Sequence, residues 1–446
     1  PRSTLFPYTT LFRSADGTSR FKKKWGYFPS FSLGWNIMAE EFAKDFKQNT
    51  SFSQLKLRGG WGHVGNQASA GDFDYLALMT NGYTAVFGGS QVDGAIQQKL
   101  ANEELSWETS EQYNIGLDYG LLNGALSGNI DYFIRNTNDM ILDTPIPIYA
   151  GMWRPKTNAG SVRNSGFEFS LNYEKSIGQD FTFNAGGNIS FIKNEVTSLG
   201  GGEPLYGQYS KTEVGKEIGY FYGLQSMGIF KTEEQLNSYV NEKGSPIQPN
   251  ASLGDVQFKD QNGDGVIDDN DRVYLGSAMP DFTYGLTLSA AYKGLDLNLF
   301  FQGSQGNKIA NYMYSVLYST SMREWSNSKD MMNRWTPENS NSNLPRVHDG
   351  DPNQNDRFSS RYVEDGSYFR LKTLQLGYTL PSVISKKAFL SKARIYVSAD
   401  NLFTITNYSG YNPEISDLWG NPLNAGVDMA TYPTPRVFTI GCNLSF

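Results

Sequence analysis

Apolar and polar side chains alternate with a period of two over most of this chain. Residues 26–36 read "GYFPSFSLGWN", with large apolar side chains at every second position of the run, and residues 436–446 read "RVFTIGCNLSF" with the same alternation. Such alternation predicts half-buried β-strands and not helices. About twelve strands follow from it, each close to the nine to eleven residues that cross a bilayer at a tilt.

Short and long connections alternate between these strands. Brief runs such as "GLLNG" and "KG" join the strands of each hairpin, whereas long polar segments separate the hairpins; these are residues 62–105, 136–161, 193–280, 304–366 and 404–433. Membrane barrels have short periplasmic turns and long external loops, so this rhythm predicts an all-β, antiparallel transmembrane β-barrel with Phe446 at the periplasmic rim. A soluble β-sandwich with one wet face gives the same alternation and stays open as an alternative.

The composition narrows the class of protein further. The chain of 446 residues has 46 Gly, 27 Tyr and 28 Phe but only 19% charged residues, which is typical of many strands joined by turns. No run approaches the eighteen apolar residues of a membrane helix. The single cysteine excludes a disulfide framework, and a net charge of -7 argues against a nucleic-acid partner.

Motifs for catalysis are missing from the sequence. We find no G-x-S-x-G elbow, no Walker A sequence and no H-E-x-x-H motif, so the sequence predicts neither an enzyme nor an organic cofactor. Residues 60–65, "GWGHVG", match G-x-G-x-x-G, but the polar run that follows has no helix to face a pyrophosphate. We therefore interpret these residues as a rim turn of the barrel.

Residues 260–271, "DQNGDGVIDDND", follow the spacing of a calcium-binding loop. Gly265 occupies the position of the sharp turn, and the flanking sequences read as strands and not as the helices of an EF-hand. The template predicts a structural Ca²⁺ ion bound by Asp260, Asn262, Asp264, the Val266 carbonyl, Asp268 and Asp271. The alternative is an acidic turn that binds no ion.

Two further sets of residues are candidates for binding and for membrane insertion. Flat apolar rings in the predicted external loops are weak candidates for binding substrate, although packing between loops explains them equally well. They are Trp153, Trp325, Trp335 and Trp419. A last strand that alternates up to Phe446 resembles the signal that the outer-membrane insertion machinery reads.

Several long segments resemble one known family. "LSWETSEQYNIGLDYGLLNGALSGNIDYFIRNTNDMI", "NAGSVRNSGFEFSLN" and "DGSYFRLKTLQLGYTLP" are similar to the C-terminal half of SusC/RagA-type, TonB-linked outer-membrane transporters, and the resemblance runs from about residue 15 to 446. It implies a barrel of about 22 strands, of which this chain would supply about twelve, without the N-terminal plug domain. It also implies a SusD-like surface lipoprotein as partner and contact with the TonB complex through the missing N-terminal part.

The first fourteen residues, "PRSTLFPYTTLFRS", fit this resemblance poorly. Prolines at positions 1 and 7 interrupt a run in which apolar residues alternate weakly, and proline is disfavoured within a paired strand. The run resembles translated adapter sequence, so we expect residues 1–14 to be a non-native leader and 15–446 to be the barrel segment.

The resemblance therefore implies part of an importer of large nutrients, oligosaccharides or peptides, in a Gram-negative outer membrane. Two alternatives remain open at this stage. One is a passive porin or an adhesin-like barrel, and the other is a secreted, calcium-stabilised β-sandwich that binds glycans.

Overall fold

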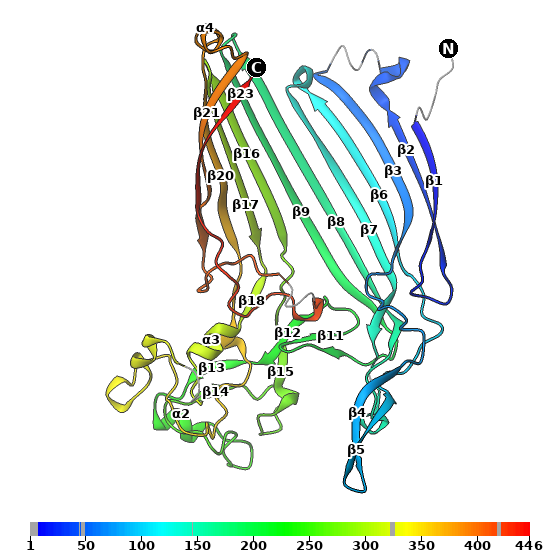
Figure 1. Cartoon of the computed structure of the whole chain (residues 1–446). Helices are drawn as coiled ribbons and strands as arrows, with labels where there is room; N and C mark the ends of the chain where they lie inside the picture. Colours follow the sequence, from blue (N-terminus) through cyan, green and yellow to red (C-terminus); the bar gives the residue numbers. More distant parts are fainter. Residues whose placement is uncertain (1–7, 44, 46–49, 145, 322–325, 417–420) are drawn as a thin grey trace. The chain divides into compact units, whose positions relative to one another are not determined.

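The computed structural model describes residues 8–43, 45, 50–144, 146–321, 326–416 and 421–446. The chain divides into two compact units, the first formed by residues 1–204 and 213–216 and the second by residues 205–212 and 217–446. Figure 1 draws both with long strands as their main elements. Among the described residues, no helix combines the length and the apolar character that crossing a membrane requires.

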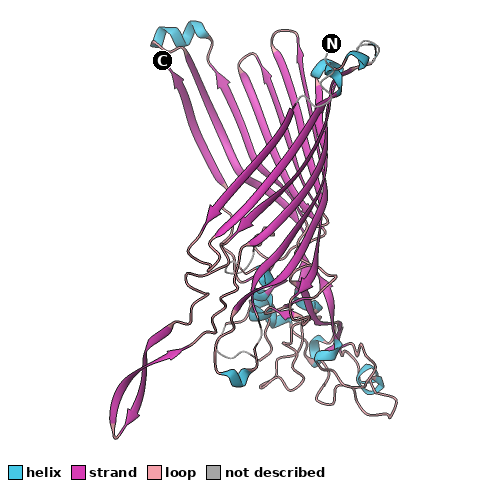
Figure 2. Cartoon of the chain, turned by 90° about the vertical axis from the view of Figure 1, so that its right-hand side faces the viewer, coloured by secondary structure: helices cyan, strands magenta, loops and turns pink. Residues whose placement is uncertain are grey.

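Seven long antiparallel strands form the sheet of the first unit. In the order of their hydrogen-bonded pairing they are β1 (Tyr8–Gly17), β2 (Trp25–Asn36), β3 (Phe52–Asn66), β6 (Glu108–Leu121), β7 (Leu126–Asp143), β8 (Lys156–Ile177) and β9 (Phe181–Leu199). Neighbouring strands along this order are joined by short turns at one end, such as residues 122–125 and 178–180. At the other end, residues 67–107 carry the hairpin of β4 (Met79–Phe87) and β5 (Ser90–Gln97), which extends away from the long strands in Figure 2.

Five long antiparallel strands form the sheet of the second unit. They are β16 (Phe282–Tyr292), β17 (Leu295–Gln305), β20 (Tyr368–Thr379), β21 (Lys392–Thr406) and β23 (Val437–Ser445). The loops of this unit hold shorter elements, namely β10 (Leu205–Tyr206), β11 (Ser210–Thr212), β12 (Tyr220–Leu224), β13 (Ser226–Ile229), α2 (Glu233–Ser238), β14 (Val256–Phe258), η5 (Asp269–Asp271), β15 (Arg272–Gly276), β18 (Lys308–Asn311), α3 (Tyr312–Leu317), β19 (Val363–Asp365) and β22 (Val427–Asp428).

The register sorts side chains into an apolar and a polar face in each sheet. Leu117 on β6 lies opposite Leu57 on one side and Ile130 on the other, and residues directly opposite each other point to the same face. In the second unit, Val397 on β21 likewise lies between Leu376 and Ile440. Leu117 is half-buried and the other apolar side chains are exposed, which is the arrangement of a barrel wall that faces lipid.

The predicted all-β, antiparallel fold with about twelve strands is confirmed. Strand length was predicted less well, because β7, β8 and β9 have 18, 22 and 19 residues, more than crossing the bilayer requires. The interpretation of "GWGHVG" as a rim turn is wrong, since those residues lie inside β3. The glycines at positions 60, 62 and 65 add no side chain to the surface of this strand.

The start of the described chain forms a strand. Residues 8–17 form β1, which pairs with β2 from Tyr8 opposite Gly34 to Gly17 opposite Trp25. Pro1 and Pro7, which motivated the prediction of a leader, lie outside the described residues. The non-native origin of residues 1–14 stays a prediction.

Candidate functional site

The polar face of the first unit carries a partly buried ion pair that spans three strands. Arg58 on β3 lies opposite Gly116 on β6, which in turn lies opposite Asp131 on β7. Both terminal guanidinium nitrogens of Arg58 donate to Asp131 at 2.7 Å, and its Nε donates to Asp118 at 2.7 Å. A Cβ on Gly116 would come within 2.4 Å of Asp131 Oδ1. Glycine at this position is therefore what lets the arginine reach across the middle strand.

The second unit contains a similar ion pair across a strand, formed by other residues. Arg394 on β21 lies opposite Thr379 on β20, and Gly377, two residues before Thr379 on the same strand, lies opposite Asp296 on β17. The guanidinium donates through Nε to Asp296 at 2.8 Å and through Nη2 to Gln375 at 2.9 Å. A Cβ on Gly377 would lie 2.3 Å from Arg394 Nη2. Each polar face thus carries an arginine that pairs with a carboxylate on another strand.

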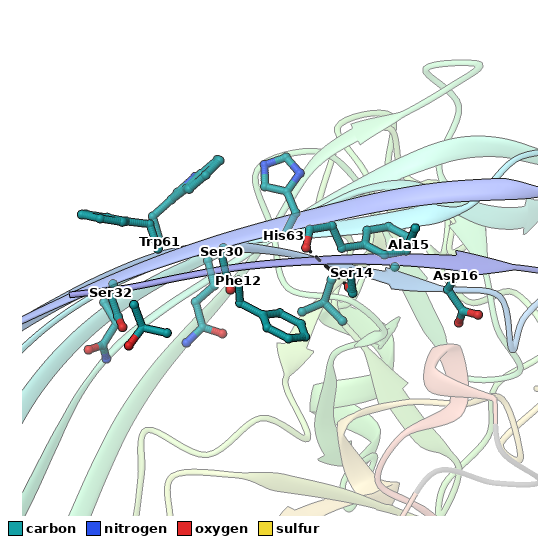
Figure 3. A pocket seen from close by; sticks show the side chains of 17 residues that line it. Phe12, Ser14, Ala15, Asp16, Ser30, Ser32, Trp61 and His63 are labelled. Carbon is teal, nitrogen blue, oxygen red and sulfur yellow. Dashed lines mark hydrogen bonds between the residues drawn. The ribbon is translucent and has the colours of Figure 1, made fainter. Parts of the chain in front are cut away.

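A hollow of about 720 Å³ lies on the polar side of β1, β2, β3 and β6. Figure 3 shows Ser14, Ser30 and Ser32 together on one side of the strands, while Trp61 and His63 extend to the other side. The Ser14 hydroxyl donates to the Phe28 carbonyl at 3.5 Å. Hydroxyl groups line this hollow together with the amides of Gln112 and Asn114 and the carboxylate of Asp16, so its chemistry suits polar ligands.

One loop segment of the second unit is held against the polar face of β20. Arg370, of which 3% is exposed, donates through Nε to Thr404 at 2.8 Å and through Nη2 to Asn412 at 2.8 Å. Its third guanidinium nitrogen pairs with Glu414, which also lies 3.4 Å from Lys372. These contacts fix residues 412–414 over the strand.

The long loops of the second unit form a small ordered body with a core of its own. Leu224, Ile229, Val256, Phe258 and Trp335 make up its apolar cluster. Beside this cluster, Arg346 donates two hydrogen bonds, at 2.8 and 2.9 Å, to the buried Asp255. Asp255 and Arg346 are 91 residues apart in the chain, so their pairing ties two loops together.

The predicted calcium loop has extended flanks, as expected, with β14 before it and β15 after it, and its last three residues form the short helix η5. Asp260 accepts from Gly263 N–H at 2.7 Å and from Gly265 N–H at 2.9 Å. Asp271, which is fully buried, accepts from Gln261 N–H and Asp268 N–H at 2.8 Å each.

The remaining template side chains of this loop are also held by backbone donors. Asn262 accepts from Asp264 N–H at 3.0 Å, Asp264 from Val266 N–H at 2.9 Å, and Asp268 from Asn270 N–H at 2.7 Å. Gly265 has φ +85°, which supports the turn predicted there. In the part of the chain that the structure describes, no group of three or more His, Cys, Asp or Glu side chains is arranged to hold a metal ion. Calcium binding therefore stays a prediction.

The tryptophan candidates have different surroundings. Trp153 is 67% exposed, whereas Trp335 is 9% exposed and packs in the apolar cluster against Gly254. These contacts give Trp335 a role in loop packing. Trp325 and Trp419 lie outside the described residues. Phe446 follows β23 and is 92% exposed, so it is accessible to a partner.

Sequence reasoning missed the two arginines that cross a strand and the hairpin of β4 and β5. The alternation in "QLKLR" does place Arg58 on the polar face, but nothing local indicates that its partner lies 73 residues away. The hairpin has one apolar face, formed by Tyr83, Ala85, Phe87, Val92 and Ile96, and all five of these side chains are exposed. An isolated two-stranded hairpin is marginally stable in water, so we expect a partner to cover this apolar face.

Comparison with known proteins identifies the family. The family model described as TonB dependent receptor-like, beta-barrel, matches residues 2–402. The chain belongs to this family. It is 36% identical over 453 residues to TonB-dependent receptor P3 of Formosa agariphila, which covers 98% of this chain and 44% of that protein. It is 31% identical over 459 residues to TonB-dependent receptor SusC of Bacteroides thetaiotaomicron, which covers 99% of this chain and 42% of that protein.

A solved structure gives the same result. The structure of the RagAB peptide transporter superposes with a TM-score of 0.81 at 25% identity, covering 98% of this chain and 46% of that one. This TonB-dependent receptor segment therefore spans less than half the length of the relatives it matches, which agrees with the predicted partial barrel. The family consists of outer-membrane β-barrel receptors and transporters, so the chain is an outer-membrane protein, and the secreted β-sandwich is excluded.

Proposed function

We propose that this chain is part of a TonB-dependent importer that carries large nutrients, oligosaccharides or peptides, across the outer membrane. The chain is similar to TonB-dependent receptor SusC and to the RagAB peptide transporter, and the second likeness supports import of a solute such as a peptide. The observation that carries the proposal is the polar face of the strands. Arg58 and Arg394 pair with carboxylates on other strands, and the hollow is lined by hydroxyls, amides and the Asp16 carboxylate, so a polar solute meets a wet, hydrogen-bonding surface.

Filling the hollow tests this proposal in a full-length receptor that carries the segment. Ser30→Trp with Ser32→Trp adds two large rings on the polar face, and uptake of the nutrient should fall several-fold while the amount of receptor in the outer membrane stays the same. Leu33→Trp, on the same strand but the other face, is the matched control and should leave uptake unchanged. Uptake that is equal in the double variant and the parent would contradict the proposal.

A SusD-like surface lipoprotein is the partner that we propose for the external side. The exposed apolar face of the β4–β5 hairpin supports a protein partner there, because its side chains have no cover among the described residues. We propose that contact with the TonB complex is made by a part of the receptor outside these residues.

The lipoprotein contact is tested by co-purification from solubilised outer membranes. Phe87→Ser with Val92→Ser removes the two large side chains near the tip of the apolar face and should reduce the lipoprotein recovered with the receptor. Val86→Ser with Met79→Ser changes equally exposed residues on the opposite face and serves as control. Equal losses in both variants would contradict a specific role of that face.

We further propose that residues 260–271 bind a structural calcium ion. The template residues supply hard oxygen donors, which Ca²⁺ prefers, and a carboxylate that accepts one or two N–H bonds keeps further lone pairs for an ion. Asp271 is shorter than the usual glutamate at that position, so the affinity should be modest, on the order of 10⁻⁴ to 10⁻³ M as in extracellular modules. An ion here would offset the entropy lost when the long loop becomes ordered.

Protease protection measures this binding. In the parent, Ca²⁺ should slow cleavage within residues 232–280, and chelator should reverse the effect. Asp264→Asn with Asp268→Asn should be cleaved at the chelator rate in either condition. Asp269→Asn, in the same loop but outside the template, should behave as the parent does. If Ca²⁺ and chelator give the parent the same rate, the loop is an acidic turn only.

A further inference from the structure

The turn between β20 and β21 exposes apolar side chains at the short-turn end of the second unit. It contains the one-turn helix α4 (Ser382–Ser385) and the 3₁₀ turn η9 (Lys386–Ala388). Val383 is 71% exposed, Ile384 53% and Phe389 91%. Figure 1 draws α4 at the same end of the strands as the C-terminus. Because membrane barrels turn briefly on the periplasmic side, this end faces the periplasm.

Hydrogen bonds hold the turn in place despite its exposure. Leu390 N–H donates to the Ser385 carbonyl at 3.0 Å, and Leu380 N–H donates to the Ala393 carbonyl at 2.9 Å. Ser391 N–H donates to Ser445 at 2.8 Å, which ties the turn to the end of β23. Phe389 has φ +60°, a conformation that a bulky residue adopts only at a cost. The ring is thus held outward by an ordered backbone.

The turn continues the apolar face of the sheet. Ala393 shares that face with Ile395, since their register partners on β23 are Leu444 and Cys442. Only 3% of Ala393 is exposed, compared with 51% of Ile395, and α4 contacts β21. The turn therefore covers the apolar, lipid-facing side of the strand near Ala393. The exposed ring of Phe389 and the branched side chains of Val383 and Ile384 extend a surface that already faces the bilayer.

The charge of this end matches an anionic surface. Residues 380–391 contain Lys386 and Lys387 and no acidic residue, and the neighbouring turn of β16 and β17 contains Lys293. Both lysines of η9 are exposed, and neither takes part in an ion pair among the described residues. By contrast, the short turns at residues 122–125 and 178–180 of the first unit carry no cation. Lysines thus occur in both short turns of the second unit, one of which carries the exposed apolar side chains.

We propose that the β20–β21 turn is a binding site for the headgroups of anionic phospholipids in the periplasmic leaflet of the outer membrane. Lys386 and Lys387 pair with the lipid phosphates, while Phe389 and Ile384 enter the acyl region beside β21. Lysines at a bilayer surface attract anionic headgroups, and aromatic rings are favoured at the interface. The site anchors the C-terminal end of the wall independently of what the receptor imports.

Native mass spectrometry of a full-length receptor that carries the segment tests this site. The probes are phosphatidylglycerol and phosphatidylethanolamine, added to the delipidated receptor in detergent. The parent should retain phosphatidylglycerol preferentially. Lys386→Glu with Lys387→Glu should reduce retained phosphatidylglycerol by about tenfold or more, since each lysine contributes to attraction of the anionic lipid. Phe389→Ser should reduce retention of both lipids.

Matched variants separate this site from general effects of charge. Lys23→Glu with Lys24→Glu reverses two adjacent exposed lysines in the turn between β1 and β2 and should leave lipid retention unchanged. Lys386→Gln with Lys387→Gln removes charge without reversing it and should still lower phosphatidylglycerol retention, with a normal heat-modifiable band as evidence of folding. Equal retention of phosphatidylglycerol by the parent and the Lys386/Lys387 variants, or an equal loss in the Lys23/Lys24 control, would overturn the proposal.

Discussion

At the scale of single residues, the wall depends on glycines that leave space for charge pairing. Arg58 reaches Asp131 only because Gly116 lies between them without a Cβ. Gly116→Ala should separate this pair and leave Asp131, of which 5% is exposed, without its cation. The expected cost is about 1–3 kcal/mol of unfolding free energy, since breaking a partly buried ion pair costs more than a surface pair.

The measurement is the temperature at which the folded band of a full-length receptor disappears on a heat-modifiability gel. Asp131→Ala should lower this temperature to a similar extent as Gly116→Ala. Gly60→Ala is the control, because the nearest atom to a Cβ there is the Phe31 carbonyl at 3.8 Å. A drop for Gly60→Ala as large as that for Gly116→Ala would show that any added methyl group on this face is harmful.

A second residue-scale prediction concerns acid. Partial burial opposes ionisation of Asp74, but hydrogen bonds from Lys99 and from Gly71 N–H outweigh it and hold the pKa of Asp74 below its ordinary value of 3.8. The stabilisation by the ionised carboxylate is therefore complete above the ordinary value and is lost as the pH falls through the lowered pKa. Residues 67–105 should open progressively below about pH 4.

Hydrogen exchange across residues 67–105 measures this opening. At neutral pH, the Asp74→Asn variant should exchange faster than the parent. The ratio of the two exchange rates should approach one as the pH is lowered, because the parent then loses its own ion pair. Asp72→Asn, a more exposed neighbour, serves as the control. A rate ratio that does not change with pH would disprove the role of Asp74 ionisation.

At the scale of elements, alternation predicts which segments are strands but not how far each strand extends. The strand cores were found from periodicity because one face of each is apolar and the other is wet. The outer ends of β7, β8 and β9 mix polar residues with buried apolar ones such as Ile141, Val162 and Val196. These ends are held by pairing with their neighbours, which no local pattern records. The calcium-type loop is the opposite case, since its Asx bonds connect residues two to ten positions apart and are encoded locally.

Contacts between loop residues far apart in the chain could not be predicted either, because no local pattern records them. Trp335 was a weak candidate for binding substrate because it lies in a predicted external loop, with loop packing as the alternative, and it belongs to one apolar cluster with Leu224 and Phe258. The pairing of Asp255 with Arg346 likewise joins two loops whose sequences show no complementarity. Residues that meet only in the folded loops leave no signal in a single sequence.

The last strand carries an element-scale prediction. β23 alternates up to Ser445 and is followed by the exposed Phe446, which resembles an insertion signal. In a full-length receptor, Phe446→Ser should lower the amount found in the outer membrane several-fold. Phe403→Ser, which removes an exposed ring from β21, should lower it less. Equal amounts of the two variants on an immunoblot of purified outer membranes would count against the signal.

At the scale of the whole molecule, the strands at the ends of the pairing order determine whether the segment can fold by itself. Among the described residues β1 pairs with β2 alone, and β23 pairs with β21 alone. Each therefore has an edge of backbone N–H and C=O groups without a strand partner. Hydrocarbon supplies no hydrogen bonds to satisfy such an edge, and each unsatisfied group costs several kcal/mol.

Residues 1–446 expressed without further strands should therefore aggregate in detergent and give no heat-modifiable band. The matched comparison is a full-length receptor that carries the same residues, which should give the band and a single species by size-exclusion chromatography. Supplying the remaining barrel strands as a separate chain should restore the band if edge pairing is the missing contribution. A monodisperse, protease-resistant species formed by residues 1–446 alone would show that the edges are satisfied in another way and that the segment is an autonomous unit.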